Sequence, residues 1–330
     1  MQKITVLIPC YNSGKFLLRL LTSLDKQTNK DFHIIFLDDF SKDATLSMLK
    51  NWTAKNESNF LSIKIIENKQ NKGIAYNRNL LIDSCETSHF IFFDSDDKLS
   101  PKCIEIFSQY LDKGQDMVFS KFNLFFRNIP LINIFFKYRK IKKNLTPEQI
   151  IKSGFNFVWN ILINKEFYKK IGAKFLENYN CEDMLLPLLV LKAGKISFTN
   201  QITHSYFLNS GSISNTKSVF NLESLNANAH YFYELVIKHN LLSKVLIHNL
   251  DIFLLKSLFF MVRPIKNNEK SREIYLQSWK EIEKINKLLE EWKVYERFMN
   301  LKTNDFHFVS SYKLSAKVFK FYTKNLSKFV

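Results

Sequence analysis

Long apolar runs and paired cysteines are both missing from this sequence. No uninterrupted apolar stretch reaches the roughly 18 residues that a membrane-spanning helix needs; the two closest stretches, 117–136 and 245–262, are broken by charged residues. The four cysteines are scattered without CxxC spacing, which indicates neither a zinc site nor a disulfide framework and fits a reducing cytosol. Because an apolar strand-like segment begins within the first few residues, we also expect no signal peptide.

Two common nucleotide-binding motifs are absent as well. No GxGxxG follows the first strand expected, residues 3–8, and no Walker A motif occurs in the chain. The first absence disfavours a dinucleotide-binding Rossmann site, and the second disfavours a P-loop NTPase. A nucleotidyltransferase on a similar fold would need a Gly-rich, Arg-containing loop after the first strand, and the segment PCYNSG at 9–14 is not such a loop.

Positive charge, by contrast, is abundant. The formal net charge is +17 over 330 residues, which implies an anionic partner such as nucleic acid, a membrane surface or a phosphorylated substrate. Residues 311–330 contain no acidic residue and place five lysines on one helical face, opposite an apolar face. Such a basic amphipathic helix is typical of a segment that lies on an anionic membrane. A helix packed on its own domain with a solvated lysine face explains the pattern equally well.

Strand-like and helix-like segments alternate through the first part of the chain. Strands are expected at 3–8, 32–37, 61–67 and 90–93, with helices at 15–27, 44–54 and 75–85 between them. This alternation predicts an α/β fold with a mostly parallel sheet between helices. From about residue 217 helical patterns take over. We therefore expect a catalytic α/β domain at 1–215 and a helical C-terminal region at 216–330.

The expected strand at 90–93 ends in an acidic cluster formed by Asp94, Asp96 and Asp97. In open α/β sheets the ligand crevice lies at the carboxyl ends of the strands. Carboxylates this close raise each other's pKa unless a cation lies among them, and oxygen-only ligands favour Mg²⁺ or Mn²⁺. The strand at 32–37 likewise runs into Asp38 and Asp39. The alternative is an ordinary acidic turn, since Asp and Ser are common turn residues.

The order of five segments resembles one family of enzymes. They are VLIPCYN at 6–12, LDDFSKDAT at 37–45, NKGIAYNRN at 71–79, FDSDD at 93–97 and ED at 182–183. Together they resemble the GT-A-fold glycosyltransferases of family 2, which build bacterial surface polysaccharides and lipooligosaccharides, over roughly the first two-thirds of the chain. The chain departs from that family at Phe40, where Gly is usual, and at Phe207, where many members have Arg.

The resemblance implies a role for each matching residue. The metal ion, Mn²⁺ or Mg²⁺, would bind Asp96 and Asp97 and stabilise the leaving diphosphate. The general base that deprotonates the acceptor hydroxyl would be Asp183, with Glu182 beside it. His204 is a further candidate ligand, although a structural histidine explains it as well. The donor nucleotide sugar would contact Pro9, Tyr11, Asp39, Arg78, Asp94 and Asp96.

The sequence thus predicts an inverting, metal-dependent glycosyltransferase that moves a sugar from a UDP-sugar to a glycan or lipid-linked acceptor in surface polysaccharide or lipooligosaccharide synthesis. It would be cytoplasmic and peripheral on the inner face of the cytoplasmic membrane, with no nucleic acid partner. Two alternatives stay open: a catalytically inactive GT-A-like scaffold and a basic nucleic-acid-binding protein. The second leaves the acidic clusters at strand ends unexplained, because they would repel a phosphate backbone.

Overall fold

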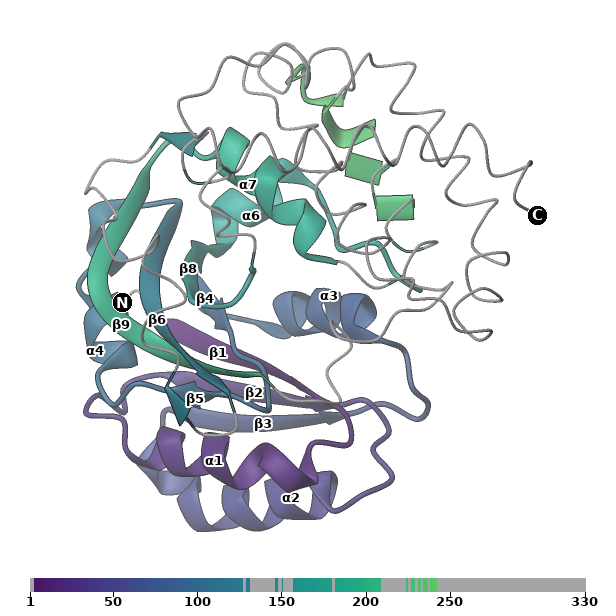
Figure 1. The fold of residues 1–330 in the computed structure, drawn as a ribbon, viewed down its shortest axis with the longest axis vertical. Helices are drawn as coiled ribbons and strands as arrows, with labels where there is room; N and C mark the ends of the chain where they lie inside the picture. The colour runs from purple at the N-terminus through teal and green to yellow at the C-terminus, as the bar shows by residue number, and fades with distance from the viewer. Residues whose placement is uncertain are drawn as a thin grey trace. The chain divides into compact units, whose positions relative to one another are not determined.

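The computed structural model describes residues 3–126, 129–130, 146–147, 150, 157–179 and 182–208, and scattered positions between 224 and 241 (Figure 1). The chain divides into two compact units, Met1–Asn178 with Glu182–Ile213, and Tyr179–Cys181 with Ser214–Val330. The basic helix expected at 311–330 lies outside the described residues, and the helical character of 216–330 stays a prediction. No helix in the described ranges is long and apolar enough to cross a membrane.

Four parallel strands form the first half of the sheet, in the order β3-β2-β1-β4. Helices α1 and α2 lie on one side of these strands and α3 lies on the other (Figure 1). The strands are β1 (Ile4–Cys10), β2 (His33–Asp38), β3 (Ser62–Glu67) and β4 (His89–Phe92), and the helices are α1 (Gly14–Asp25), α2 (Thr45–Asn56) and α3 (Ile74–Ser84).

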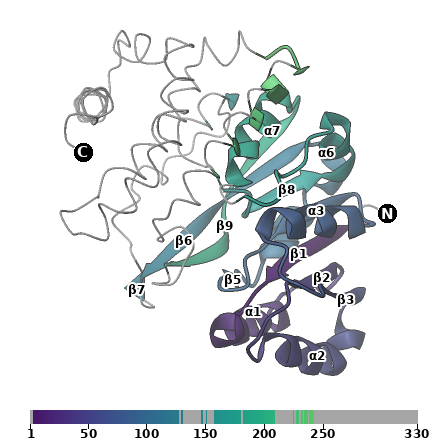
Figure 2. The ribbon, with the colours of Figure 1, turned by 90° about the vertical axis from the view of Figure 1, so that its right-hand side faces the viewer.

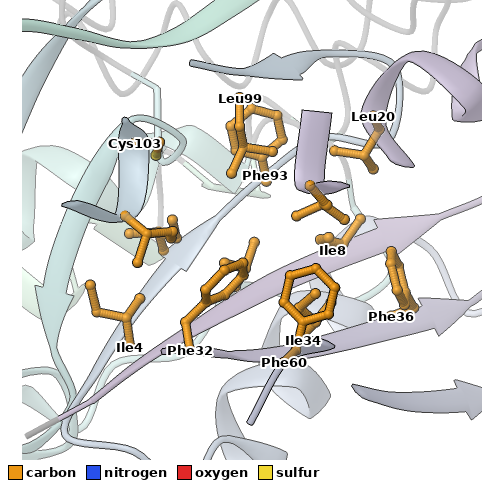
Figure 3. Packing of buried hydrophobic residues seen from close by; sticks show 14 of the residues in the cluster. Ile4, Ile8, Leu20, Phe32, Ile34, Phe36, Phe60, Phe93, Leu99 and Cys103 are labelled. Carbon is orange, nitrogen blue, oxygen red and sulfur yellow. The ribbon is translucent and has the colours of Figure 1, made fainter. Parts of the chain in front are cut away.

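Apolar side chains explain why these elements pack together. Every residue of β1 is buried, as expected for a strand covered by helices on both faces. The apolar stripe of α1 buries Leu17, Leu20, Leu21 and Leu24, which recur at the spacing of one helical face. Figure 3 shows this cluster, where Phe32 and Phe36 of the β2 region meet Ile8 of β1 and Leu20 of α1.

The second half of the sheet is mixed. β8 (Ile161–Asn164) pairs antiparallel with both β4 and β6 (Met117–Phe126), whereas β9 (Ile196–Leu208) runs parallel to β6. Figure 2 shows the two long strands β6 and β9 side by side. The sequence pattern predicts two short strands here, Ile196–Phe198 and His204–Phe207, and the structure joins them into one strand.

Shorter elements complete the described part of the first unit. β5 (Lys98–Leu99) pairs antiparallel with Ser205 and His204 of β9. Because β5 directly follows the acidic turn after β4, this pairing places β9 beside that turn. The other elements are β7 (Ile129–Pro130), α4 (Cys103–Ser108), α6 (Lys165–Ile171), α7 (Leu186–Lys192), and the 3₁₀ turns η1 (Glu57–Asn59), η2 (Leu111–Lys113) and η4 (Glu182–Leu185).

The start of α7 differs from expectation. The apolar sequence at 184–192 predicts a helix that begins directly after the acidic pair. In the structure Glu182–Leu185 form a 3₁₀ turn and the helix begins at Leu186. Pro187 stands in the first helical turn, where the missing N–H of proline costs no hydrogen bond. Asp183 is therefore carried by a tight turn ahead of the helix.

Candidate active site

The acidic turn lies where β4 ends, at the carboxyl edge of the parallel strands. Phe93 N–H donates to the carbonyl of Leu7 at 3.0 Å, and Asp97 N–H donates to the carbonyl of Asp94 at 3.2 Å, which closes the turn. Asp94 and Asp96 are partly exposed, whereas Asp97 is fully buried. The turn therefore presents two carboxylates to solvent and keeps the third inside the protein.

Asp97 is held by β9 through both of its oxygens. Its Oδ2 lies 2.7 Å from His204 Nε2, and its Oδ1 accepts the backbone N–H of Phe207 at 2.9 Å. Burial lowers the pKa of His204 to about 3. Burial, and after it the charge of Asp94, raises the pKa of Asp97. Asp97 thus fastens the turn to β9 through both oxygens, and its predicted role as a metal ligand beside Asp96 stays a prediction.

Arg78 of α3 joins the acidic turn to the acidic pair that comes far later in the chain. Its side chain is buried, and its Nη2 lies 3.3 Å from Asp94 Oδ1. Its Nη1 lies 3.7 Å from Asp183 Oδ1, which also accepts the backbone N–H of Val158 at 3.1 Å. The structure therefore brings Asp94 and Asp183, assigned from the sequence to donor and acceptor, next to the same guanidinium. The predicted contact of Arg78 with the nucleotide stays a prediction.

The surroundings of Arg78 and Asp183 limit how they move. The guanidinium carbon lies 5.3 Å from the ring centroid of Phe92 and 5.9 Å from that of Phe175. A buried cation costs little only when it is paired, so the two carboxylates are needed to keep it there. The side chain of Asp183 remains 38% exposed, which leaves it accessible to a substrate. The side chain of Glu182, its predicted neighbour, lies outside the described residues.

Asp39 is buried and organises the loop that leads into α3. Its Oδ1 accepts hydrogen bonds from Asn68 Nδ2 at 2.8 Å and from Lys72 N–H at 2.7 Å. Its Oδ2 accepts Gly73 N–H at 2.9 Å. Since a carboxylate offers about four acceptor positions, one remains for the predicted contact of Asp39 with the donor nucleotide sugar. These hydrogen bonds also fix where α3 begins, and therefore where Arg78, which lies on α3, is placed.

The loops after β1 and β2 are tied together beside Asp39. Asn12 N–H donates to Ser41 Oγ at 2.9 Å, and Lys42 N–H donates to Asn12 Oδ1 at 2.8 Å. Tyr11 is 51% exposed at this edge, whereas Pro9 is buried within β1. The two predicted donor contacts therefore differ in accessibility.

The backbone conformation of Phe40 bears on one departure from the family pattern, the phenylalanine at a position where glycine is usual. Its backbone has φ of +63°, the left-handed region in which glycine is favoured and bulky side chains are rare. The turn therefore keeps the conformation that glycine would give it. The phenyl ring is partly exposed, and Lys42 Nζ lies 3.3 Å from its centroid.

Comparison with known proteins decides the family. The model described as "Glycosyl transferase family 2" matches residues 5–172. The chain belongs to glycosyl transferase family 2. The predicted family and the predicted enzyme class, a glycosyltransferase, are thereby confirmed.

Relatives with assigned activities extend this family match over the rest of the chain. The glycosyltransferase is 28% identical over 324 residues to the processive diacylglycerol beta-glycosyltransferase of Mycoplasma genitalium, covering 93% of this chain and 94% of the relative. It is also 28% identical over 241 residues to the cholesterol galactosyltransferase of Borreliella burgdorferi, covering 68% of this chain and 66% of the relative.

Solved structures confirm the predicted GT-A fold. The glycosyltransferase matches residues 1–349 of S. aureus TarS with a TM-score of 0.66 and 17% identity, covering 99% of this chain and 92% of that chain. A second structure of the same protein, in complex with UDP-GlcNAc, matches with the same TM-score and coverage at 18% identity.

The glycosyltransferase also contains a stack of aromatic rings that sequence analysis did not single out. The His204 ring lies 4.3 Å from the Phe93 ring and 4.4 Å from the Trp159 ring, and Trp159 stacks on Tyr206 at 5.0 Å. His204 and Tyr206 share one face of β9 because side chains two residues apart point the same way. The alternation of side chains along β9 was the sequence signal that could have placed His204 and Tyr206 together.

Tyr206 lies among the acids of the site. Burial raises the pKa of its hydroxyl, and nearby carboxylates raise it further, so the hydroxyl stays protonated and can donate a hydrogen bond. The carboxylates responsible are those of Asp97, Asp94, Asp96 and Asp183. Tyr206 therefore belongs to the same site as the predicted donor and acceptor residues.

Proposed function

We propose that this family 2 glycosyltransferase transfers a sugar from a UDP-sugar to a lipid-linked acceptor, with inversion and with the help of a divalent cation. One observation carries the proposal: buried Arg78 holds Asp94 and Asp183 on the same guanidinium, at 3.3 Å and 3.7 Å. An acid of the donor turn and the candidate base for the acceptor are thus neighbours, as a direct displacement between two substrates requires.

The donor side would use the exposed carboxylates of the turn. Among the described residues no group of three or more His, Cys, Asp and Glu is arranged to hold a metal ion. Asp96 and Asp94 offer hard oxygen ligands, which suits Mg²⁺ or Mn²⁺ bound jointly with substrate phosphates and water. An ion bound there would stabilise the charge that develops on the leaving diphosphate. The TarS structure with UDP-GlcNAc supports a UDP-sugar as donor.

Asp183 would take the proton from the acceptor hydroxyl. The hydrogen bond from Val158 N–H and the guanidinium of Arg78 fix the orientation of its carboxylate. A base held in this way needs little reorganisation when the hydroxyl attacks the sugar. The Mycoplasma genitalium relative is named for a beta product, and a beta product made from an α-linked nucleotide sugar requires inversion.

The acceptor and the location follow from the relatives and the charge. Two relatives are named for lipid acceptors, diacylglycerol and cholesterol, and the first of them aligns over nearly the whole chain. We therefore favour a membrane lipid over a soluble glycan. The basic segment at 311–330 would hold the enzyme on the anionic inner face of the cytoplasmic membrane.

A donor and acceptor screen tests the proposal. The full chain is incubated with a panel of UDP-sugars and Mn²⁺ or Mg²⁺, with diacylglycerol vesicles, sterol vesicles or oligosaccharides as acceptor. We expect UDP release that depends on vesicles, and a glycolipid product whose anomeric configuration is opposite to that of the donor. UDP binding without turnover on any acceptor would favour the inactive scaffold, and nucleic acid binding without UDP binding would favour the other alternative.

A further inference from the structure

A second cation, Arg19 of α1, contacts the acidic turn. Its Nη2 donates a hydrogen bond to the backbone carbonyl of Asp96, and its side chain is partly buried. The guanidinium carbon lies 3.6 Å from the ring centroid of Phe207. Arg19 therefore contacts the backbone of Asp96, and the side chain of Asp96 is proposed to face the donor.

The ring beneath Arg19 is itself held in place. Phe207 is buried on β9, and its ring stacks on that of Phe125 with centroids 4.7 Å apart and planes 12° apart. Its backbone N–H donates to Asp97 Oδ1 at 2.9 Å. Phe207 thus binds the turn through its backbone and binds Arg19 through its ring. Three segments distant in sequence, α1, the turn and β9, meet at this contact.

The chemistry of this contact favours arginine over lysine. A guanidinium is planar, so it stacks on an aromatic face while its N–H groups donate in the plane of the group. A lysine ammonium in the same place provides either the cation–π contact or the hydrogen bond to the carbonyl, but its geometry does not provide both together. In this chain the cation that lies on the Phe207 ring comes from α1.

We propose that Arg19, seated on Phe207, is a positioning residue that sets the backbone of Asp96 and thereby aims the Asp96 carboxylate at the donor. This inference rests on the proposed function, since it gives Asp96 a role toward the UDP-sugar. A site ligand has to be held within about 0.5 Å of its working position. The stacked guanidinium of Arg19 holds the carbonyl of Asp96 and so positions this residue, although Arg19 is not itself a ligand.

Four variants test the inference: Arg19→Ala, Arg19→Lys, the exchange Arg19→Phe with Phe207→Arg, and Lys98→Ala as control. Lys98 is exposed, follows the turn directly and carries the same charge as Arg19. For each, initial rates over a range of UDP-sugar, UDP affinity by calorimetry and the thermal unfolding midpoint are measured. Arg19→Ala should lower kcat/KM by roughly tenfold to a hundredfold, mainly through a higher KM and weaker UDP binding.

The conservative variant and the exchange separate positioning from folding. Arg19→Lys should recover little of the UDP affinity. The exchange should recover thermal stability but little UDP affinity, because it restores the cation–ring pair and not the hydrogen bond from residue 19 to the carbonyl of Asp96. Lys98→Ala should stay within about twofold of the parent enzyme, since an exposed charge contributes little.

Unchanged UDP affinity and KM in Arg19→Ala would overturn the inference and leave the proposed function intact. A loss of thermal stability in Arg19→Ala with KM unchanged, or full recovery of UDP affinity in the exchange, would overturn it too, because the hydrogen bond to the carbonyl of Asp96 would then have no role in donor binding. If the parent enzyme binds no UDP at all, the proposed function fails, and the inference that depends on it fails as well.

Discussion

The guanidinium of Arg78 lies 3.7 Å from the carboxylate of Asp183, although one residue belongs to α3 and the other to the turn before α7. The same guanidinium lies 3.3 Å from Asp94. A buried cation between two carboxylates keeps them close without repulsion. The distance between the two halves of the proposed site therefore depends on one side chain.

Replacing Arg78 tests this dependence. We expect Arg78→Ala to reduce kcat/KM at least a hundredfold, because two carboxylates would be left facing each other. It should also lower the free energy of unfolding by about 2–3 kcal/mol, less than for a fully buried pair since both acids are partly exposed. Urea denaturation and steady-state rates measure the two effects.

A surface ion pair provides the control for Arg78. Lys174 and Asp83 lie 3.4 Å apart with both side chains more than half exposed. Lys174→Ala should change the free energy of unfolding by less than about 1 kcal/mol. Equal losses in the two variants would contradict a special role for Arg78.

Asp183→Asn tests the general base. The amide keeps the size of the carboxylate but does not accept a proton, so kcat should fall by about 10²–10⁴-fold. UDP affinity should stay close to that of the parent enzyme, because Asp183 is proposed to face the acceptor. Single-turnover rates and UDP calorimetry measure these separately. A normal turnover rate in Asp183→Asn would exclude it as the base.

Asp96 and Asp97 should fail in different ways when replaced. Asp96→Ala should remove the dependence of the rate on added Mn²⁺ together with most of the activity, as chelation of the parent enzyme should. Asp97→Ala leaves His204 Nε2 and the Phe207 N–H without their acceptor, and should cost about 1–3 kcal/mol of unfolding free energy per group. Metal titrations and urea denaturation measure the two outcomes. Full activity in excess chelator would overturn the metal assignment.

The stability of the protein should fall on mild acidification. His89 is buried, and burial lowers its pKa to about 4. In the unfolded chain His89 binds a proton near pH 6.5, whereas in the folded chain it binds one only near pH 4. The contribution of His89 to stability is therefore full above pH 6.5 and declines as the pH falls toward 4. In the buried pair of His204 and Asp97, burial lowers the pKa of His204 and raises that of Asp97, so the two partners act in opposite directions on acidification.

Urea denaturation at pH 7 and pH 5 measures the effect of His89. Its contribution to the loss should be about 2 kcal/mol, and His89→Gln should remove that part of the difference. Burial also lowers the pKa of His33, which is partly buried, so His33 adds to the loss in the same direction. An unchanged difference between the two pH values in His89→Gln would contradict the assignment to His89.

Local sequence was enough for most of the fold. The strands β1, β2 and β4 are mainly apolar runs, and helical spacing of leucines marked α1, so most of the parallel half followed from short-range pattern. The joining of β9 into one strand was not visible in the sequence, because its length is set by pairing with β6 far away in the chain. Pairing partners of a strand are a tertiary property.

The site divides in the same way. The sequence by itself determined which acids gather at the strand ends, since their order and spacing lie within short motifs. It also indicated the family whose model matches residues 5–172. Tertiary structure decided where those acids point. Asp97 turns inward because His204 and Phe207 of β9 bind it, and the Asp96 backbone is held by Arg19. A side chain's direction within a turn depends on hydrogen-bond partners that only folding brings near.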